Sequence, residues 1–369
     1  MDLNPLPIED FSALPSPGLV VCPERVKANL CRMIDKVGGH DGVGRLRPHL
    51  KTHKMAEVTR MQVEAGITKA KVATTAEAEM AAGAGVADIL LAHQPVGPKV
   101  DELARLAAAF PEVSFAAVTD DADSAQALAE RLGSTEKPFR LFIDVDCGMG
   151  RTGVPFGEKL DLLRTCIEST PGVTFAGIHL YDGHLHSPNP EQRFRGVAHV
   201  ASLALKHLEA RGPAVVVVGG SPTFGTWASE TDWECSPGTT LFWDVGYGAA
   251  FPDLDFQIAA ALVTRVVSKP GSDRLTFDLG YKAVAAEKTL KTRVLLPDFP
   301  DAVFVGQSEE HLVVETAAAA NVCVGDAFQA LPFHVCPTVA LHDYASILRH
   351  GKPSGEIWPV TSRRRRLLT

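Results

Sequence analysis

The sequence predicts a (β/α)8 barrel followed by an antiparallel β domain. Eight short β-rich runs alternate with longer amphipathic runs over about 200 residues, a repeat that suits a closed parallel barrel better than an open doubly wound sheet. After about Phe256 the long helical patterns end and short strand-like runs follow one another. No GxGxxG motif follows the first run, which disfavours a dinucleotide-binding fold.

The barrel strands are expected where a short apolar run is bounded by polar or glycine-containing segments. In chain order these runs are 19–22, 45–51, 69–74, 88–93, 114–120, 139–146, 173–181 and 214–219. Apolar residues at helical spacing predict the helices that connect them. The expected helices are 24–37, 55–65, 76–84, 100–110, 123–132, 159–169 and 192–210. We therefore expect the barrel to span residues 18–255.

The last third of the chain predicts a smaller β domain. Its expected strands are 257–267, 274–278, 292–296, 311–315 and 327–332. The proline-rich start of the chain is expected to pack against them. We therefore expect this domain to contain residues 256–369 together with residues 1–17.

The composition argues against a membrane protein and against a nucleic-acid-binding protein. Hydrophobic residues make up 46% of the chain, and no apolar run reaches the roughly 18 residues of a membrane span. The net charge of −8 disfavours nucleic acid as the main partner, and the basic run 363–366 is expected to be a solvated tail. The start of the chain lacks a signal-peptide pattern and the seven cysteines include no CxxC pair, so we expect a reduced, cytoplasmic protein.

The motif Arg47-Pro-His-Leu-Lys51-Thr-His53-Lys54 is the most informative feature of the chain. It places a lysine at the carboxyl end of a strand, where parallel α/β proteins carry their chemistry. Crowding by Arg47, His53 and Lys54 would disfavour the charged form of Lys51 and make its amine available for a Schiff base. The alternative is a solvated charge in a loop, and the motif alone leaves both interpretations open.

Two further strand ends carry candidate side chains. The run 144–153 contains glycines that let the backbone approach a ligand closely, and Arg151 supplies a cation. The run 179–186 contains Tyr181, His184 and His186, which offer an aromatic ring and acid–base groups. A polar rim around the barrel is the alternative interpretation of both runs.

A phosphate site is expected at the turn after the last predicted strand. Gly220, Ser221 and Thr223 offer N–H and hydroxyl groups there, and Gly238 and Thr239 would add a second wall. A plain turn is the alternative. A lysine, an arginine, a tyrosine and such a turn at one barrel mouth jointly suit pyridoxal phosphate, because the lysine forms the imine and the turn holds the phosphate.

These motifs resemble the alanine-racemase-fold, or fold type III, pyridoxal-phosphate enzymes. RPHLKTHK, DVDCGMGRTG, the Gly-Gly-Ser turn and the late HVCPT are similar to the branch that contains D-threonine aldolase and eukaryotic-type D-serine dehydratase, over residues 17–359. The resemblance implies a barrel with a C-terminal β domain, and a homodimer. It implies that Lys51 carries the cofactor and that Arg151 and Tyr181 contact its ring. The residues that it assigns to the phosphate are Gly220, Ser221, Thr223, Gly238 and Thr239.

His334 and Cys336 form the second diagnostic motif. Alternate residues on a strand point to one face, so both side chains would bind one ion and leave positions open for water or a substrate oxygen. Core packing is the alternative for an isolated His-x-Cys pair. The resemblance favours a metal, since D-threonine aldolases usually carry His-x-Asp here and D-serine dehydratases carry His-x-Cys. A thiolate ligand favours Zn²⁺ over Mn²⁺ or Mg²⁺.

The resemblance implies a lyase that depends on pyridoxal phosphate and a divalent metal and acts on small D-amino acids with a 3-hydroxyl. Cys336 favours β-elimination, in which D-serine gives pyruvate and ammonia. Retro-aldol cleavage of D-threonine to glycine and acetaldehyde is the main alternative, with His184 or His186 as its base. A racemase and a non-catalytic cofactor carrier are more distant alternatives, and the β domain counts against the carrier because such carriers are lone barrels.

Overall fold

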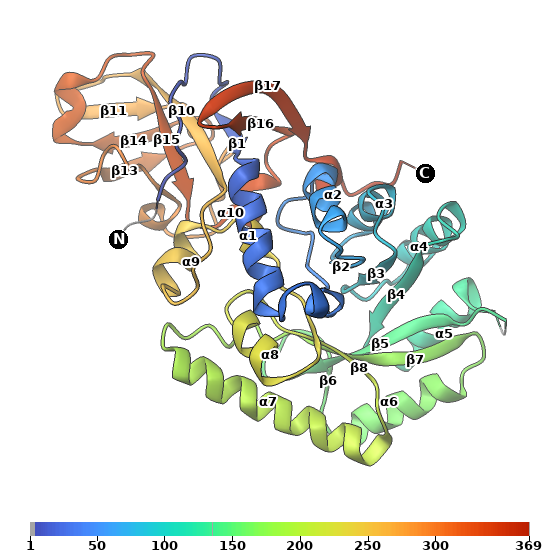
Figure 1. Ribbon diagram of the computed structural model, residues 1–369. Helices are drawn as coiled ribbons and strands as arrows, with labels where there is room; N and C mark the ends of the chain where they lie inside the picture. The colour runs from blue at the N-terminus through green and yellow to red at the C-terminus, as the bar shows by residue number, and fades with distance from the viewer. Residues whose placement is uncertain (1–3, 135, 369) are drawn as a thin grey trace. The chain divides into compact units, whose positions relative to one another are not determined.

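The computed structural model describes residues 4–134 and 136–368, so residues 1–3 and 369 of the expected β domain lie outside the described part. The chain divides into two compact units (Figure 1). The first, called here the β unit, comprises Met1–Arg32, Thr52–Met55 and Thr239–Arg363. The second, called here the barrel unit, comprises Met33–Lys51, Ala56–Gly238 and Arg364–Thr369.

The barrel unit is built on a parallel sheet. Its strands are β2 (Lys69–Val72), β3 (Asp88–Leu91), β4 (Ser114–Thr119), β5 (Phe139–Asp146), β6 (Val154–Pro155), β7 (Val173–Leu180), β8 (Val215–Val218) and β9 (Glu234–Cys235). They pair in the order β2-β3-β4-β5-β7-β8-β9, with β6 beside β5. Leu90, Phe142 and Val217 come from three different strands and belong to one buried apolar cluster. The barrel interior is therefore packed with side chains, as in other barrels of this size.

The segment 46–50 closes this sheet into a barrel. Leu46 forms a parallel bridge with Cys235 of β9, and His49 forms a parallel bridge with Lys71 of β2. The segment therefore lies between the first and last strands of the sheet and serves as the eighth barrel strand. The expected (β/α)8 barrel is confirmed.

Helices lie on the outside of the barrel (Figure 1). They are α2 (Ala56–Glu64), α3 (Thr75–Gly83), α4 (Pro98–Ala109), α5 (Ala122–Leu132), α6 (Glu158–Ser169), α7 (Pro190–Arg211) and α8 (Phe224–Glu230). Side-chain caps fix where several of them begin. Thr74 accepts the Glu77 N–H at 3.1 Å before α3, and Asp121 accepts the Ser124 N–H at 2.8 Å before α5. These caps set the lengths of the loops that follow the carboxyl ends of β2 and β4.

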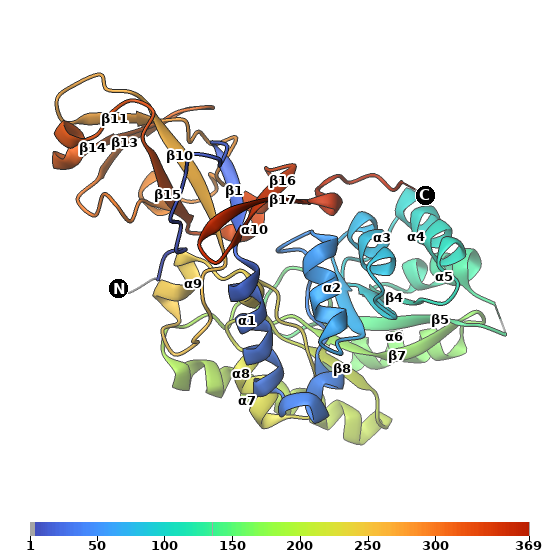
Figure 2. The same ribbon diagram turned by 45° about the horizontal axis from the view of Figure 1, so that its top comes forward.

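The β unit contains a nine-stranded sheet. Its strands are β1 (Gly18–Val21), β10 (Ala260–Ser268), β11 (Arg274–Phe277), β12 (Val294–Leu295), β13 (Val303–Gln307), β14 (Leu312–Glu315), β15 (Ala327–Pro332), β16 (Tyr344–Arg349) and β17 (Lys352–Pro359). The order is β13-β14-β11-β10-β1-β16-β17, and β15 pairs with β10 and β12. Figure 2 shows β1 beside the hairpin of β16 and β17. The expected antiparallel β domain is confirmed, and each of its expected runs overlaps a strand.

Few helices complete the β unit. They are α1 (Pro23–Lys36), which continues into the barrel unit, α9 (Val245–Ala250) and α10 (Val335–Val339). Short 3-10 helices occur at Gly39–Arg45 in the barrel unit and at Thr239–Leu241, Leu290–Thr292, Ala317–Asn321 and Thr361–Arg363 in the β unit. In the part of the chain that the structure describes, every helix is too short or too polar to cross a membrane.

The first and last barrel strands differ from the expectation. Residues 19–22 overlap β1, which pairs with β10 and β16 in the β unit. The barrel ends instead with β9, a two-residue strand that carries no periodic signal. A short, wholly apolar run does not reveal which sheet it joins, because its partners are set by contacts that are distant in sequence.

Arg47 holds the barrel together and does not crowd Lys51. Its guanidinium is 1% exposed and bonds Asp88 through two contacts of 3.0 and 3.1 Å. Its Nε lies 2.6 Å from Glu234 Oε2. Because Asp88 and Glu234 are the first residues of β3 and β9, Arg47 points to the amino-terminal end of the barrel, away from the end that carries Lys51.

Candidate functional site

Lys51 lies beside the ring of Tyr181 in the barrel unit. Lys51 follows the closing strand 46–50, and Tyr181 follows β7. The Lys51 Nζ is 5.7 Å from the ring centroid, and the guanidinium carbon of Arg151 is 4.6 Å from the same centroid. The structure therefore brings together, from three different strand ends, the side chains that the sequence assigns to the cofactor ring and its covalent link.

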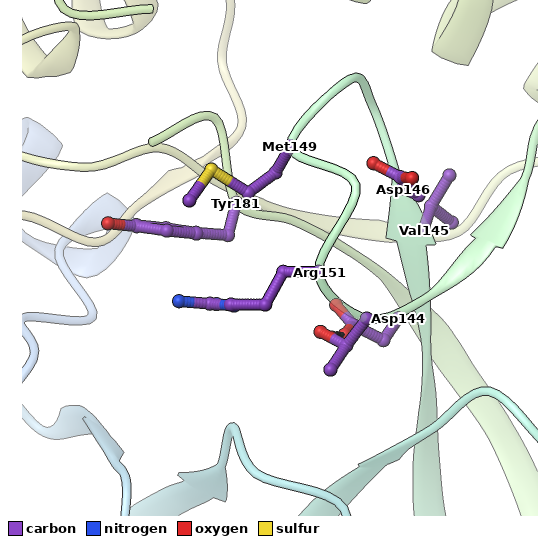
Figure 3. A pocket seen from close by; sticks show the side chains of 7 residues that line it. Asp144, Val145, Asp146, Met149, Arg151 and Tyr181 are labelled. Atoms are coloured by element: carbon purple, nitrogen blue, oxygen red, sulfur yellow. Dashed lines mark hydrogen bonds between the residues drawn. The ribbon is translucent and has the colours of Figure 1, made fainter. Parts of the chain in front are cut away.

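The loop after β5 presents Arg151 to this ring. Asp146 ends β5, and its Oδ1 accepts the N–H groups of Gly150 and Gly148 at 3.0 Å each, which lowers the pKa of Asp146. Figure 3 shows the guanidinium lying parallel to the Tyr181 ring, as in a cation–π contact. A small, open pocket is lined by Asp144, Val145, Asp146, Met149, Arg151, Thr152 and Tyr181.

Two glycines leave room for the side chains of Tyr181 and His184. A Cβ at Gly183 would lie 2.6 Å from the Tyr181 ring, and a Cβ at Gly148 would lie 2.8 Å from His184 Nε2. Gly148 also has a φ of +124°, which L side chains rarely adopt. Gly148 therefore accommodates His184, and the close approach of this loop to a ligand stays a prediction.

The two candidate histidines have different surroundings. His184 packs over Gly148, and its Nδ1 is buried without a hydrogen-bond partner among the residues that the structure describes. His186 is exposed, and its Nδ1 lies 3.1 Å from the Gly183 carbonyl oxygen. The geometry therefore makes His184 the better placed of the two for a buried ligand, and the role of either as an aldol base stays a prediction.

A hydrogen bond joins the turn after β8 to the segment at Gly238. The Gly238 N–H donates to Ser221 Oγ at 3.2 Å, so the two walls expected from the sequence lie side by side. The Thr223 hydroxyl is fully buried, donates to the Gly220 carbonyl oxygen at 3.4 Å, and also bonds Asp182. Thr223 therefore holds the turn in place through hydrogen bonds to Gly220 and Asp182, and its side chain is buried.

Asp182 is a buried acid that the sequence analysis did not single out. The Trp227 Nε1 donates to its Oδ2 at 2.7 Å. Burial raises the pKa of Asp182 and outweighs the hydrogen bonds from Thr223 and Trp227, which act in the opposite direction. Because it follows Tyr181 directly in the chain, Asp182 ties the end of β7 to the turn after β8.

Lys71 is a buried lysine of the barrel unit that the sequence analysis also did not single out. Its Nζ is 5.9 Å from the Tyr181 centroid and 3.2 Å from His179 Nε2. Burial, and then the positive charge of Lys51, lower the pKa of Lys71 to about 7. The sequence feature that could have identified Lys71 is a lysine inside an apolar strand, between the buried residues Ala70 and Val72.

In the β unit, His334 and Cys336 lie at the start of a helix and not on a strand. His334 is the N-cap of α10, and Cys336 lies in its first turn. The two side chains still meet, because a hydrogen bond joins the imidazole to the thiol. Pro337 explains the difference, since it has no N–H to donate to a strand ladder and suits the first turn of a helix.

The surroundings of Cys336 favour its thiolate. Burial raises the pKa of Cys336, but the hydrogen bond and charge of His334, together with the two threonine hydroxyls, outweigh burial and lower it. The Oγ1 atoms of Thr52 and Thr239 lie 3.2 and 3.5 Å from the sulfur. Thr239, which the resemblance assigns to the phosphate, therefore contacts the thiol, and Thr52 follows Lys51 directly in the chain.

His334 is held by a carboxylate on one ring nitrogen. Its Nδ1 lies 2.6 Å from Glu287 Oε1. Burial lowers the pKa of His334, but Cys336, Glu287 and Asp244 outweigh burial and raise it to about 9. A carboxylate on the far nitrogen is common in metal-binding histidines, so this nitrogen–sulfur pair has ligand types that fit a divalent ion. Among residues 4–134 and 136–368, no three His, Cys, Asp or Glu side chains are grouped to hold a metal.

Comparison with known proteins agrees with the two-unit arrangement. The family model described as alanine racemase, N-terminal domain, matches residues 21–245, and a serine dehydratase domain model matches residues 259–348. The chain is 30% identical to 3-hydroxy-D-aspartate aldolase of Paracoccus denitrificans, over 98% of this chain and 95% of that protein. It is 27% identical to D-threo-3-hydroxyaspartate dehydratase of a Delftia species, over 89% and 92%. A crystal structure of D-threonine aldolase from Filomicrobium marinum has a TM-score of 0.85 at 26% identity, covering 95% of this chain and 96% of that chain.

The two family models match the predicted barrel and the predicted β domain in that order along the chain. The first spans more than half of the chain. The relatives match over nearly their whole length. The chain therefore belongs to the D-threonine aldolase and D-serine dehydratase family of alanine-racemase-like, pyridoxal-phosphate-dependent lyases.

Proposed function

We propose that this lyase acts on a small D-amino acid bearing a 3-hydroxyl, and that Lys51 is the residue linked covalently to pyridoxal phosphate. The observation that carries the cofactor assignment is the approach of Lys51 and Arg151 to the Tyr181 ring. Pyridoxal phosphate supplies an electron sink for the bond that breaks at the substrate Cα. The hydrogen bond between Gly238 and Ser221 brings the residues proposed for the phosphate together at the turn after β8.

The roles of the chain's own residues follow from this placement. Lys51, the proposed link to the cofactor, would be the amine that removes the Cα proton of the substrate. Arg151 keeps a fixed positive charge against the face of Tyr181, which helps to hold the Tyr181 ring in place. Gly183 allows Tyr181 to lie close against the backbone, so a side chain at that position would displace the ring.

We further propose that His334 and Cys336 bind one divalent ion, with Zn²⁺ favoured by the thiolate. The lowered pKa of Cys336 and the Glu287 carboxylate on His334 support this proposal. The ion would act as a Lewis acid on the 3-hydroxyl of the substrate. Within the β unit Cys336 contacts Thr52. The family resemblance is what connects this pair with the cofactor lysine.

The reaction that we favour is β-elimination, in which the 3-hydroxyl leaves and D-serine gives pyruvate and ammonia. The His-x-Cys pattern supports it, because D-serine dehydratases of this family carry that pattern. A D-threo-3-hydroxyaspartate dehydratase has been solved as a cysteine-to-alanine mutant in a metal-free form and as a histidine-to-alanine mutant, at positions two residues apart. Retro-aldol cleavage is the second candidate, supported by the full-length similarity to 3-hydroxy-D-aspartate aldolase.

The cofactor assignment is tested by absorbance. The purified protein is incubated with pyridoxal phosphate, and the visible band of the lysine–cofactor link is recorded before and after borohydride reduction. Lys51→Ala should lose the band and the reducible link. Lys54→Ala is the matched control and should keep both. A band that survives in Lys51→Ala and disappears in Lys54→Ala would show that the link belongs to the other lysine.

The reaction is tested by product analysis. The protein is incubated with D-serine, D-threonine, D-threo-3-hydroxyaspartate and their L-forms, and 2-oxo acid and glycine are measured separately. Elimination predicts 2-oxo acid and ammonia from the D-forms. Glycine without pyruvate, 2-oxobutanoate or oxaloacetate would rule out elimination and leave the aldolase, because aldol cleavage of 3-hydroxyaspartate gives glyoxylate beside glycine. Interconversion of D- and L-forms without either product would point to a racemase.

Three expectations from the sequence remain proposals. A homodimer is expected from the family, and light scattering at micromolar concentration would contradict it by giving the mass of one chain. A cytoplasmic location is expected from the cysteine usage, and cell fractionation tests it. Elemental analysis of the purified protein tests the preference for zinc over manganese and magnesium.

A further inference from the structure

The lumen of the barrel unit contains a chain of three hydrogen-bonded side chains. The Lys71 Nζ of β2 is 3.2 Å from His179 Nε2 of β7, and His179 Nδ1 is 2.7 Å from Asp144 Oδ1 of β5. Thr152 donates to the other Asp144 oxygen at 2.7 Å. In the barrel, β2 and β7 are separated by β3, β4 and β5, so the contact between Lys71 and His179 crosses the lumen.

The direction of the hydrogen bonds follows from the charge of Asp144. Burial raises the pKa of Asp144, but His179 and then Thr152 outweigh it and lower the pKa. Asp144 is therefore a carboxylate that accepts the Nδ1 proton of His179. Burial and the charge of Lys71 lower the pKa of His179, so its ring is neutral and Nε2 accepts a hydrogen from the Lys71 amine. Asp144 and His179 thus fix the position of that amine without giving it a counter-charge at contact distance.

The charges that face Lys71 come from several strand ends. After burial, Lys51 lowers its pKa most and Arg151 acts in the same direction, whereas Asp182 and Asp144 oppose them. The net result is a pKa of about 7. Lys51 and Lys71 lie 5.7 and 5.9 Å from the centroid of one ring, that of Tyr181. Both amines therefore lie near one ring, and the charge of Lys51 acts on Lys71.

We propose that Lys71 is a positioning residue for the cofactor site: held by His179 and Asp144 across the lumen, its amine controls the protonation state of the nitrogen by which Lys51 holds the cofactor. The proposal rests on the proposed role of Lys51. Only N–H bonds change in this coupling, and the proton that one nitrogen loses passes to solvent or to the other nitrogen.

The test is a pH titration of the visible cofactor band in the holoenzyme without substrate. Lys71→Met removes the charge but keeps the length of the side chain, and should raise the midpoint of the titration by roughly one pH unit, the shift typical of a nearby charge. Lys71→Arg keeps a fixed cation and should leave the midpoint at or below that of the wild type. Lys69→Met is the matched control, because Lys69 lies on the same strand but pairs with Glu234, the first residue of β9. It should titrate like the wild type.

A second variant covers the case in which Lys71→Met does not fold. Asp144→Asn removes a charge that raises the pKa of Lys71, so Lys71 loses its proton at lower pH and the cofactor midpoint should again rise. A band that depends on Lys51 and titrates identically in wild type, Lys71→Met and Asp144→Asn would overturn this proposal alone, as would an equal shift in Lys69→Met. A protein whose band does not depend on Lys51 would overturn the cofactor assignment and this proposal together.

Discussion

Replacing Arg47 by methionine should destabilise the protein strongly, although Arg47 is remote from the proposed chemistry. The guanidinium is 1% exposed and makes three charged contacts, two to Asp88 and one to Glu234. Removing one partner of a buried ion pair typically costs about 3–5 kcal/mol, because the remaining charge is left buried. Asp88 keeps Arg140 at 3.2 Å, and Glu234 keeps Lys69. Because each carboxylate retains one cation, we expect the free energy of unfolding to fall by about 3 kcal/mol, the lower end of that range.

The loss also has a predicted pH dependence. Burial raises the pKa of Asp88, but the hydrogen bonds and charge of Arg47 outweigh it and lower the pKa. A lowered acid pKa contributes stability above the ordinary value of 3.8, and this stability is lost as the pH falls through the folded-state pKa. The difference in the free energy of unfolding between wild type and Arg47→Met should therefore be largest at pH 7. It should shrink as the pH falls below about 4.

The assay is urea unfolding followed by circular dichroism at pH 7 and at acid pH. Arg131→Met is the control, because its pair with Asp101 is exposed on both sides, and such pairs contribute a few tenths of a kcal/mol. If Arg47→Met unfolds within about 1 kcal/mol of the wild type, the size of an ordinary surface change, the ion-pair cluster does not hold the barrel closed and our reasoning is wrong.

Three further changes test other parts of the structure. Gly183→Ala places a Cβ 2.6 Å from the Tyr181 ring and should weaken cofactor binding about tenfold, measured by fluorescence titration, whereas Gly225→Ala meets open space and should bind normally. Cys336→Ser should lower the bound metal measured by elemental analysis while the visible cofactor band remains. Burial raises the pKa of Asp244 to about 6 from 3.8, so its charge is disfavoured in the folded state and stability should fall by roughly 3 kcal/mol between pH 4 and 6. Asp244→Asn should lack that fall in urea unfolding at the two pH values.

The fold was largely predictable because its periodic signals are local. Alternating strand and helix patterns identify the barrel whatever the strands later pair with, and the run 327–332 coincides with β15. What failed depends on contacts between distant residues. The apolar run 19–22 fits either sheet by composition, and only its pairing with β10 and β16 decides. Similarly, Arg47 was interpreted as a neighbour of Lys51 because the two are close in sequence, although they point to opposite ends of the barrel.

The candidate-site residues that belong to sequence motifs were predictable. Those that meet only inside the folded barrel were not. Lys51, Arg151 and Tyr181 stand in recognisable strand-end motifs, and the structure brings them together. Lys71 and His179 each occupy one position in an apolar strand, so their meeting across the barrel has no signature in either strand alone. His334 and Cys336 meet as expected, but they do so at the start of a helix. The reason is Pro337, which has no N–H to donate to a strand and suits the first turn of a helix.

The closing strand has a consequence for how the protein is made. Ser236 Oγ donates to the Arg47 carbonyl oxygen, a contact between residues 189 positions apart. Contacts of this separation form late, because the intervening chain must be ordered first, and on the ribosome the strand that precedes Lys51 must wait until β9 has emerged. Lys51 therefore reaches its final place only when the ring of strands closes. Uptake of the cofactor by a nascent chain would then report completion of the barrel, and chains truncated before β9 would leave Lys51 without its site.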